Sequence, residues 1–236
     1  MAIATGIANS SENAKTGRMV QTWIMRSDVH PFAAIHDGDD ESVCGDCPLR
    51  GRLEEGPLKL VNRGRSCYVN VAWAPSQVWS TWRDGRYHQL SSRRLKLIAG
   101  LPVRLGSYGD PVAVPVHLWE QLVSSATGHT GYTHQWRKRR HRSYRHLLMA
   151  SVESQRDADL ARSRGWRTFR IRQPGEPLLS REFACPASNE QGNRLTCAEC
   201  LACDGAGANH QRASVAIVIH GSPSILGSYN HLRIQQ

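Results

Sequence analysis

The feature that most constrains this chain is a cysteine-rich segment at residues 185–205, CPASNEQGNRLTCAECLACDG. It contains a Cys-Pro pair at Cys185 and a CxxCxxC run formed by Cys197, Cys200 and Cys203. Three thiolates spaced two residues apart, with a fourth upstream, can close around one metal centre. Four cysteines within nineteen residues argue against a set of buried free thiols. We therefore expect this segment to bind metal.

The spacing of these cysteines bears on which metal they bind. Zinc usually takes its cysteines in separated CxxC pairs. Iron–sulfur clusters of the bacterial ferredoxin kind take a CxxCxxC run together with a remote cysteine that precedes proline. Both features occur here, although the Cys-Pro pair lies upstream of the run. We predict a [4Fe–4S] cluster at this segment, with zinc as the alternative.

Three further cysteines form a second candidate site nearer the N-terminus. Cys44 and Cys47 lie in CGDCPLRG, and Cys67 opens an apolar stretch, CYVNVA, that we expect to be a strand. A fourth metal position would fall to His30, His36, an aspartate, water or a substrate. A structural zinc site and an iron–sulfur cluster that binds a ligand at its unique iron both fit this pattern.

Length and cysteine usage limit the class of protein. The chain has 236 residues, enough to bury a core without disulfides, and its seven cysteines are an odd number. The N-terminus lacks the basic start and apolar region of a signal peptide, and no apolar run could span a bilayer. We expect a cytoplasmic protein with metal rather than disulfides and no membrane partner. We predict a disordered lead-in over residues 1–17 and one α/β domain over residues 18–236, with cysteine sites at 44–67 and 185–205.

The net charge of +10 predicts a polyanionic partner, or a small molecule that carries phosphate or carboxylate. Part of the excess is concentrated in one basic run: Arg137, Lys138, Arg139, Arg140, Arg142 and Arg145. Such a run can contact a nucleic-acid backbone, and it can equally form a solvated helix face.

Strand-like and helix-like segments alternate along the chain. We expect strands at residues 20–25, 67–72, 101–106, 131–134, 146–152, 166–171 and 214–221, and helices at 75–82, 90–99, 119–126, 137–145 and 154–165. This alternation predicts a parallel sheet with right-handed crossovers. Six or seven strands suit a partial or full α/β barrel, and a doubly wound sheet is the alternative fold.

Polar residues follow the predicted strands, where parallel α/β folds bind their ligands. We predict catalytic roles for Asp110, His134 and Glu153, and substrate contacts for Ser107, Tyr108, Gly109, Gln135, Arg170 and His220. The turn GSYGDP allows backbone to approach a ligand closely. The sequence has no GxGxxG, no phosphate-loop motif, no GxSxG and no HExxH, which argues against several common enzyme classes.

Two resemblances extend this interpretation. The motifs CGDCPLRG, CYVNV, VRLGSYGDP, TGYTHQW, MASVES, GWRTFR and CxxCxxC resemble a family of uncharacterised phage and plasmid proteins, over most of the chain from about residue 17. That resemblance implies a host cytoplasm and supplies no activity. More distantly, the layout is similar to radical SAM enzymes, which have a partial α/β barrel, a three-cysteine cluster with an open iron, a glycine-rich strand end and often an auxiliary cluster. The CxxxCxxC of those enzymes is absent, and Cys44, Cys47 and Cys67 would stand in its place.

Two functions follow as expectations. The first is an iron–sulfur enzyme of radical-SAM-like type with one or two [4Fe–4S] clusters, S-adenosylmethionine as cofactor and an unknown substrate. The second is a zinc-stabilised nucleic-acid-binding protein without catalysis. The sequence does not determine the oligomeric state.

Overall fold

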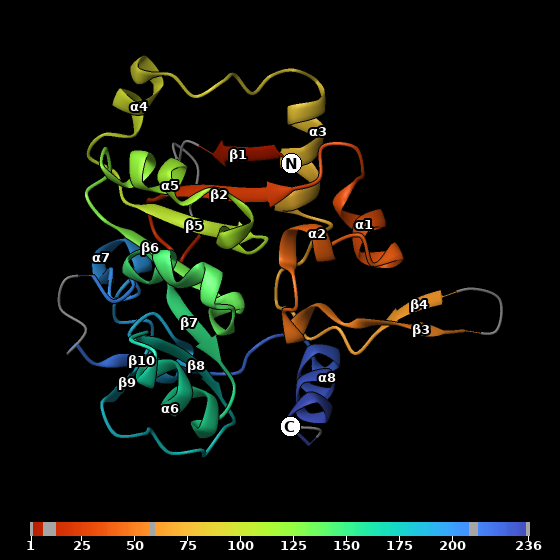
Figure 1. Cartoon of the computed structure of the whole chain (residues 1–236), viewed down its shortest axis with the longest axis vertical. Coiled ribbons are helices and arrows are strands. Elements are labelled where there is room, and N and C mark those ends of the chain that lie inside the picture. Colours follow the sequence, from red (N-terminus) through yellow and green to blue (C-terminus); the bar gives the residue numbers. More distant parts are fainter. Residues whose placement is uncertain (1, 7–12, 57–59, 208–211, 235–236) are drawn as a thin grey trace.

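The computed structural model describes residues 2–6, 13–56, 60–207 and 212–234, and its centre is an eight-stranded sheet (Figure 1). The strand order across the sheet is β1-β2-β5-β6-β7-β8-β10-β9. In that order the strands are β1 (Ala2–Gly6), β2 (Val20–Met25), β5 (Val103–Tyr108), β6 (His129–Thr133), β7 (Met149–Val152), β8 (Thr168–Arg172), β10 (Ser214–Val218) and β9 (Glu182–Ala184). β1 runs antiparallel to β2, and every other pair is parallel. The expected α/β class with a parallel sheet is confirmed.

The strands β2, β5, β6, β7 and β8 follow one another in this order both along the described chain and across the sheet. The crossovers carry helices α5 (Val116–Val123) and α6 (Gln155–Ser163). Side chains alternate between the two faces of a strand, and one face of the sheet packs its apolar residues against these helices. Trp119 of α5 and Ala161 of α6 share a buried core with Leu105 and Val152. The opposite face is therefore left to line a pocket.

The remaining elements surround the sheet. The other helices are α1 (Pro31–Asp37), α2 (Glu41–Cys44), α3 (Ala74–Arg83), α4 (Ser92–Ile98), α7 (Cys197–Cys200) and α8 (Pro223–Ile234). Strands β3 (Arg52–Glu55) and β4 (Leu60–Arg63) form a separate two-stranded sheet. Short 3₁₀ helices occupy Pro48–Arg50, Pro111–Ala113, Gln135–Arg137, Arg139–His146 and Asn189–Gln191. Among the described residues, no helix combines the length and the apolar character needed to cross a membrane.

Local signals explain several of the expected elements. The predicted strand at residues 20–25 coincides with β2, and the predicted helix at 154–165 contains α6. Ser154 caps α6 by accepting a hydrogen bond from the Asp157 N–H, and Gly165 follows the helix with a φ of 79°. Element boundaries that depend on such local chemistry were predictable.

Other segments differ from the expectation. The stretch at residues 67–72 is not a strand: Cys67 pairs through its backbone with a loop residue, so its β-forming side chains have no strand to join. Residues Ala2–Gly6 of the predicted lead-in form β1, because β2 offers a free edge, while residues 1 and 7–12 lie outside the described residues. The basic run is helical but of the 3₁₀ kind over Arg139–His146. Helix α8 was not predicted, and it is anchored by the Tyr229 hydroxyl, which donates to the Ile171 carbonyl.

Candidate functional site

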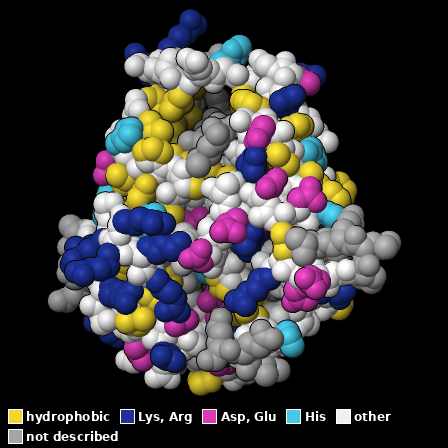
Figure 2. Space-filling view, turned by 45° about the vertical axis from the view of Figure 1, so that its right-hand side comes forward, with side chains coloured by type: hydrophobic (Ala, Val, Ile, Leu, Met, Phe, Trp, Pro, Cys, Tyr) yellow, Lys and Arg dark blue, Asp and Glu magenta, His cyan; other side chains and the backbone are white. Residues whose placement is uncertain are grey.

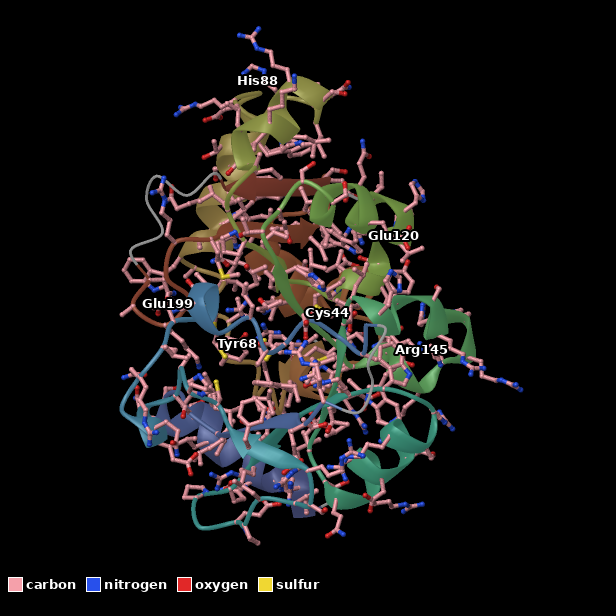
Figure 3. All side chains as sticks on the ribbon, turned by 90° about the vertical axis from the view of Figure 1, so that its left-hand side faces the viewer. Cys44, Tyr68, His88, Glu120, Arg145 and Glu199 are labelled. Atoms are coloured by element: carbon pink, nitrogen blue, oxygen red, sulfur yellow. The ribbon has the colours of Figure 1, made fainter. Side chains whose placement is uncertain are left out.

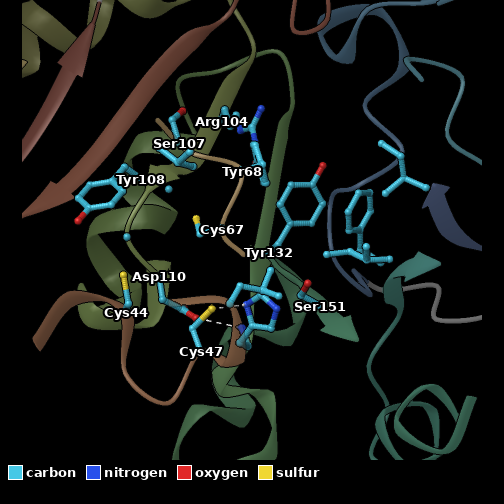
Figure 4. Close-up of a pocket in the computed structure, with 18 of the residues that line it drawn as sticks. Cys44, Cys47, Cys67, Tyr68, Arg104, Ser107, Tyr108, Asp110, Tyr132 and Ser151 are labelled. Atoms are coloured by element: carbon cyan, nitrogen blue, oxygen red, sulfur yellow. Dashed lines mark hydrogen bonds between the residues drawn. The ribbon is translucent and has the colours of Figure 1, made fainter. Parts of the chain in front are cut away.

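A cavity of about 140 Å³ lies on the sheet face that α5 and α6 leave free (Figure 4). Tyr132, Phe169, Ile171 and Ile217 project from neighbouring strands and form its apolar wall. Residues from both cysteine groups line the same cavity, at Cys44, Cys47, Cys67, Cys185 and Cys197. The fold thus brings the two candidate metal sites to one pocket, although the first and last of these cysteines are more than 150 residues apart in sequence.

A buried carboxylate organises the three N-terminal cysteines. Asp40 is fully buried, and its carboxylate lies 3.1 Å from Arg50 and 3.4 Å from Arg65. The backbone carbonyl of Asp40 accepts a hydrogen bond from the Cys44 N–H at 2.8 Å. The two arginines flank the two ends of the loop that separates Cys47 from Cys67, so one ion-paired carboxylate holds both ends together.

Backbone hydrogen bonds complete this loop. The Cys67 N–H donates to the Leu49 carbonyl at 2.9 Å, two residues beyond Cys47. Figure 4 shows the side chains of Cys44, Cys47 and Cys67 arriving from different directions around the same part of the cavity. Burial raises the pKa of Cys44, and that of Cys67, and the neighbouring cysteine charges raise both further. The Cys67 backbone is therefore joined to the segment that follows the CxxC pair.

The glycine-rich end of β5 packs against β2 and helix α2. Gly106 and Gly109 have φ angles of 73° and 78°, which favour glycine. A Cβ atom on Gly109 would lie 2.5 Å from the Ile24 carbonyl oxygen. The tight approach lets the Asp110 N–H donate to the Val43 carbonyl at 2.8 Å, next to Cys44.

The three residues predicted to be catalytic lie together. The His134 ring places Nδ1 3.2 Å from the Cys47 Sγ atom and Nε2 2.9 Å from the Glu153 Oε1 atom. The His134 N–H donates to an Asp110 carboxylate oxygen at 3.0 Å. Burial lowers the pKa of His134, but the charges and hydrogen bonds of Cys47 and Glu153 outweigh burial and raise it well above its ordinary value.

This line of thiol, imidazole and carboxylate can act in two ways. It can hold Cys47 in place as a metal ligand, with His134 as a neighbouring support or fourth ligand. It can also activate a cysteine nucleophile in a chain without metal. Sequence reasoning missed the contact because Cys47 and His134 are 87 residues apart. The histidines it considered lie elsewhere: the His30 ring packs against Trp79, and His36 pairs with Asp37.

The four C-terminal cysteines are fixed mainly by the sheet. The Cys185 N–H donates to the Ala216 carbonyl of β10 at 2.8 Å, and the Cys203 carbonyl accepts from the Gly131 N–H of β6 at 3.0 Å. Burial raises the pKa of Cys203, with further increases from the charges of Cys185, Cys197 and Cys200. Of the four, Cys185 and Cys197 line the cavity.

Helix α7 carries two of these thiols and joins them to the N-terminal segment. Thr196 and Glu199 form a reciprocal capping box at its start. The Cys197 N–H donates to the Lys15 carbonyl at 2.9 Å, and the next N–H donates to the Thr16 carbonyl at 2.9 Å. All seven cysteines are free thiols. Within the described ranges, no three His, Cys, Asp or Glu side chains are grouped as a site for a metal ion, so metal binding stays a prediction.

The predicted substrate-contacting residues divide into two groups. Ser107, Tyr108, Gly109 and His220 line the cavity. Gln135 instead lies beneath the CxxC loop, where its amide donates to the Cys44 carbonyl at 3.2 Å.

Arg170 does not reach the cavity. It is fully buried and pairs with Glu182 at 2.8 Å and Glu176 at 2.5 Å. Its strand neighbours Phe169 and Ile171 line the cavity, so Arg170, between them, projects from the opposite face of the sheet. A position near the end of a strand does predict the edge of the sheet where the cavity lies. The alternation of side chains along the strand then decides which face of the sheet each one occupies.

Two cations of the cavity wall were not predicted. Arg104 and Lys15 both line it. The available signal for Arg104 was a lone basic residue between Val103 and Leu105 in an otherwise apolar strand, LPVRLG.

The basic run lies at the periphery, at Arg137, Lys138, Arg139, Arg140, Arg142 and Arg145, which we term the basic surface. Figure 3 shows Arg145 at the edge of the molecule, whereas Cys44 and Tyr68 lie towards its middle. Arg137 pairs with Asp157 at 2.5 Å, and Lys138 pairs with Asp46 at 2.6 Å. Lys and Arg side chains gather on part of the face in Figure 2. A shallow hollow between Trp136 and Trp166 is lined by four residues of the basic run and by Arg164.

Comparison with known proteins finds no match among family models, curated proteins or solved structures. The functional argument therefore depends on the residues and geometry of this chain.

Proposed function

We propose that this chain is an iron–sulfur protein of radical-SAM-like type that acts on a small molecule in the cavity. The observation that carries the proposal is the meeting of two cysteine groups at one pocket. Three cysteines on one side offer a site with an open coordination position, and the four of the C-terminal segment offer a closed one. A ligand in the cavity would then lie between two centres.

The strand order supports the same proposal. Sequential parallel strands from β2 to β8, with the helices α5 and α6 on one face and a pocket on the other, would suit a partial α/β barrel. In this interpretation the cysteine loop follows the first parallel strand, and the Gly-Asp turn ends the second. Both lie at the carboxyl ends of the strands, where such folds bind their ligands.

The roles of individual residues follow from their contacts. Cys44, Cys47 and Cys67 would hold a [4Fe–4S] cluster, which would supply the iron position that binds S-adenosylmethionine. His134, held between Cys47 and Glu153, would orient the Cys47 thiolate and can hold or release a proton beside it. Asp110 would fix the His134 backbone and present its buried carboxyl at the cavity rim. Cys185, Cys197, Cys200 and Cys203 would hold the second cluster.

The decisive experiment is metal and sulfide analysis of the protein purified without air. The proposal expects a brown protein with iron and acid-labile sulfide, and loss of about half of both in the double variant Cys44→Ala, Cys47→Ala. A matched variant, Ser42→Ala in helix α2, should keep the full content. A colourless protein with stoichiometric zinc would refute the iron–sulfur assignment, and a metal-free protein whose Cys47 is readily alkylated would favour the nucleophile instead.

The basic surface supports a second candidate function, a zinc-stabilised nucleic-acid-binding protein without catalysis. Arg139, Arg140 and Arg142 are exposed, and the hollow beside them is walled by further arginines. Under this proposal both cysteine sites hold structural zinc, and the basic surface contacts phosphates.

A further inference from the structure

The cavity contains two cations that lack a carboxylate partner among the described residues. Arg104, on β5, donates to the Tyr68 hydroxyl at 2.6 Å and lies over the Tyr132 ring at 6.0 Å from its centroid. Its Nε atom is buried and makes no hydrogen bond in the structure. A buried guanidinium N–H without an acceptor is costly, because burial has removed its water and supplied no replacement.

Lys15 is the second cation, and it lies in the segment that precedes β2. Its Nζ atom lies 3.0 Å from the His220 Nε2 atom, a neutral partner when the lysine is charged. Lys15 lines the cavity together with Arg104, so both cations face the same space.

The two ends of the cavity differ in charge. Cys44, Cys47 and Asp110 lie at one end, Arg104 with Tyr68 lies at the other, and Cys67 lies between them (Figure 4). Tyr132, Phe169 and Ile217 add apolar surface to the same cavity. A ligand that satisfies both ends has an anionic group at one end and an apolar body that extends towards the N-terminal cysteines.

We propose that Arg104 and Lys15 form an oxyanion-binding subsite, and that the substrate of this pocket carries a carboxylate or phosphate group there. The guanidinium presents planar N–H donors that match both oxyanions, and the ammonium adds a point charge. This inference rests on the proposed function only in treating the pocket as the substrate site.

The test is calorimetric titration of the anaerobically purified protein with inorganic phosphate, with sulfate and with succinate, at constant ionic strength. We expect at least one probe to bind the wild type. The comparison of phosphate affinity with succinate affinity tells whether the subsite prefers a phosphate or a carboxylate group. Arg104→Gln and Lys15→Gln should each weaken that binding by about tenfold or more. Arg104→Lys, which keeps the charge and removes the planar fork, should fall between. The matched control Arg86→Gln, which removes an exposed guanidinium paired with Asp84, should bind like the wild type.

Each other outcome overturns the proposal. Binding by none of the three probes, or binding abolished in Arg86→Gln and kept in Arg104→Gln, places no oxyanion in this cavity. Unchanged binding with altered iron content in Arg104→Gln would make these cations counter-charges for the cysteine thiolates. If Arg104→Gln does not fold, Lys15→Gln decides, because Lys15 lies in a turn outside the sheet. Iron content is measured separately, so failure of the metal proposal is distinguishable from failure of this one.

Discussion

The two cysteine groups meet at one pocket but are held there by different means. Cys44, Cys47 and Cys67 lie outside the sheet, Cys44 at the end of α2 and the other two at the ends of the loop between them. A single buried carboxylate, Asp40, joins the two ends of that loop. Cys185 and Cys203 are hydrogen-bonded through their backbones to sheet strands. The first group can therefore be disturbed while the sheet persists, whereas the second is part of the sheet's own hydrogen bonding.

The largest effect should come from the C-terminal group. Cys203→Ser should remove one metal centre and lower the melting temperature by about 6 to 12 °C, because a centre that joins residues 185–203 contributes folding free energy of roughly 3 kcal/mol or more. Calorimetric melting with metal analysis checks this. Cys44→Ser is the matched variant, and it should lose the N-terminal metal while it melts within about 4 °C of the wild type. Equal melting temperatures of the two variants would show that the two cysteine groups do not differ in their contribution to the stability of the sheet.

The next effect concerns the carboxylate that holds the N-terminal loop. Asp40→Asn should cost about 3 kcal/mol, because it leaves Arg50 and Arg65 without their buried counter-charge. It should also abolish metal binding at the N-terminal site and spare the C-terminal one. Urea unfolding and metal analysis measure the two effects. The neighbouring Asp39→Asn removes only an exposed pairing with Arg26 and should change stability by less than about 0.5 kcal/mol. If Asp40→Asn keeps both metal centres, the carboxylate does not organise the site.

A selective spectral change would sharpen the comparison without altering the fold. S-adenosylmethionine should perturb the absorption or paramagnetic resonance spectrum of the wild type, because the N-terminal site offers an open coordination position. The variant Cys44→Ala, Cys47→Ala, which keeps the C-terminal centre, should show no change on titration. A spectral response that persists in this variant would show that the ligand binds at the C-terminal cysteines, and it would contradict the open N-terminal site.

The smallest effect is expected at the basic surface. Changing Arg139, Arg140 and Arg142 to Gln should leave melting temperature and metal content unaltered, since all three are exposed. If the surface binds nucleic acid, the slope of log affinity against log salt should flatten by roughly one unit for each phosphate that the variant no longer binds. Filter binding over a range of salt concentrations measures it. A wild type that binds neither DNA nor RNA in a salt-dependent way would identify the run as a solvated surface.

The sequence was informative where a signal is local or periodic. Alternating strands and helices predicted the parallel sheet, and polar residues at strand ends brought Asp110, His134 and Glu153 to one place. It was uninformative where long-range pairing decides. Alternation places Arg170 on the helix-covered face, and Cys67 takes a loop partner at Leu49 rather than a strand. The hydrogen bond between Lys15 and Cys197 joins residues 182 positions apart, which no local pattern reports.

The position of β10 between β8 and β9 has a consequence for the order in which the chain can assemble. From β2 to β8 each new strand can pair with the one synthesised before it, so most of the sheet can form during translation. β9 precedes β10 in sequence but has its pairing edge on β10, and must wait for it. The Lys15 carbonyl likewise waits for Cys197. Closure of the pocket is thus a late event that must wait until β10 has left the ribosome, and any cofactor held in the closed pocket would be inserted after that point.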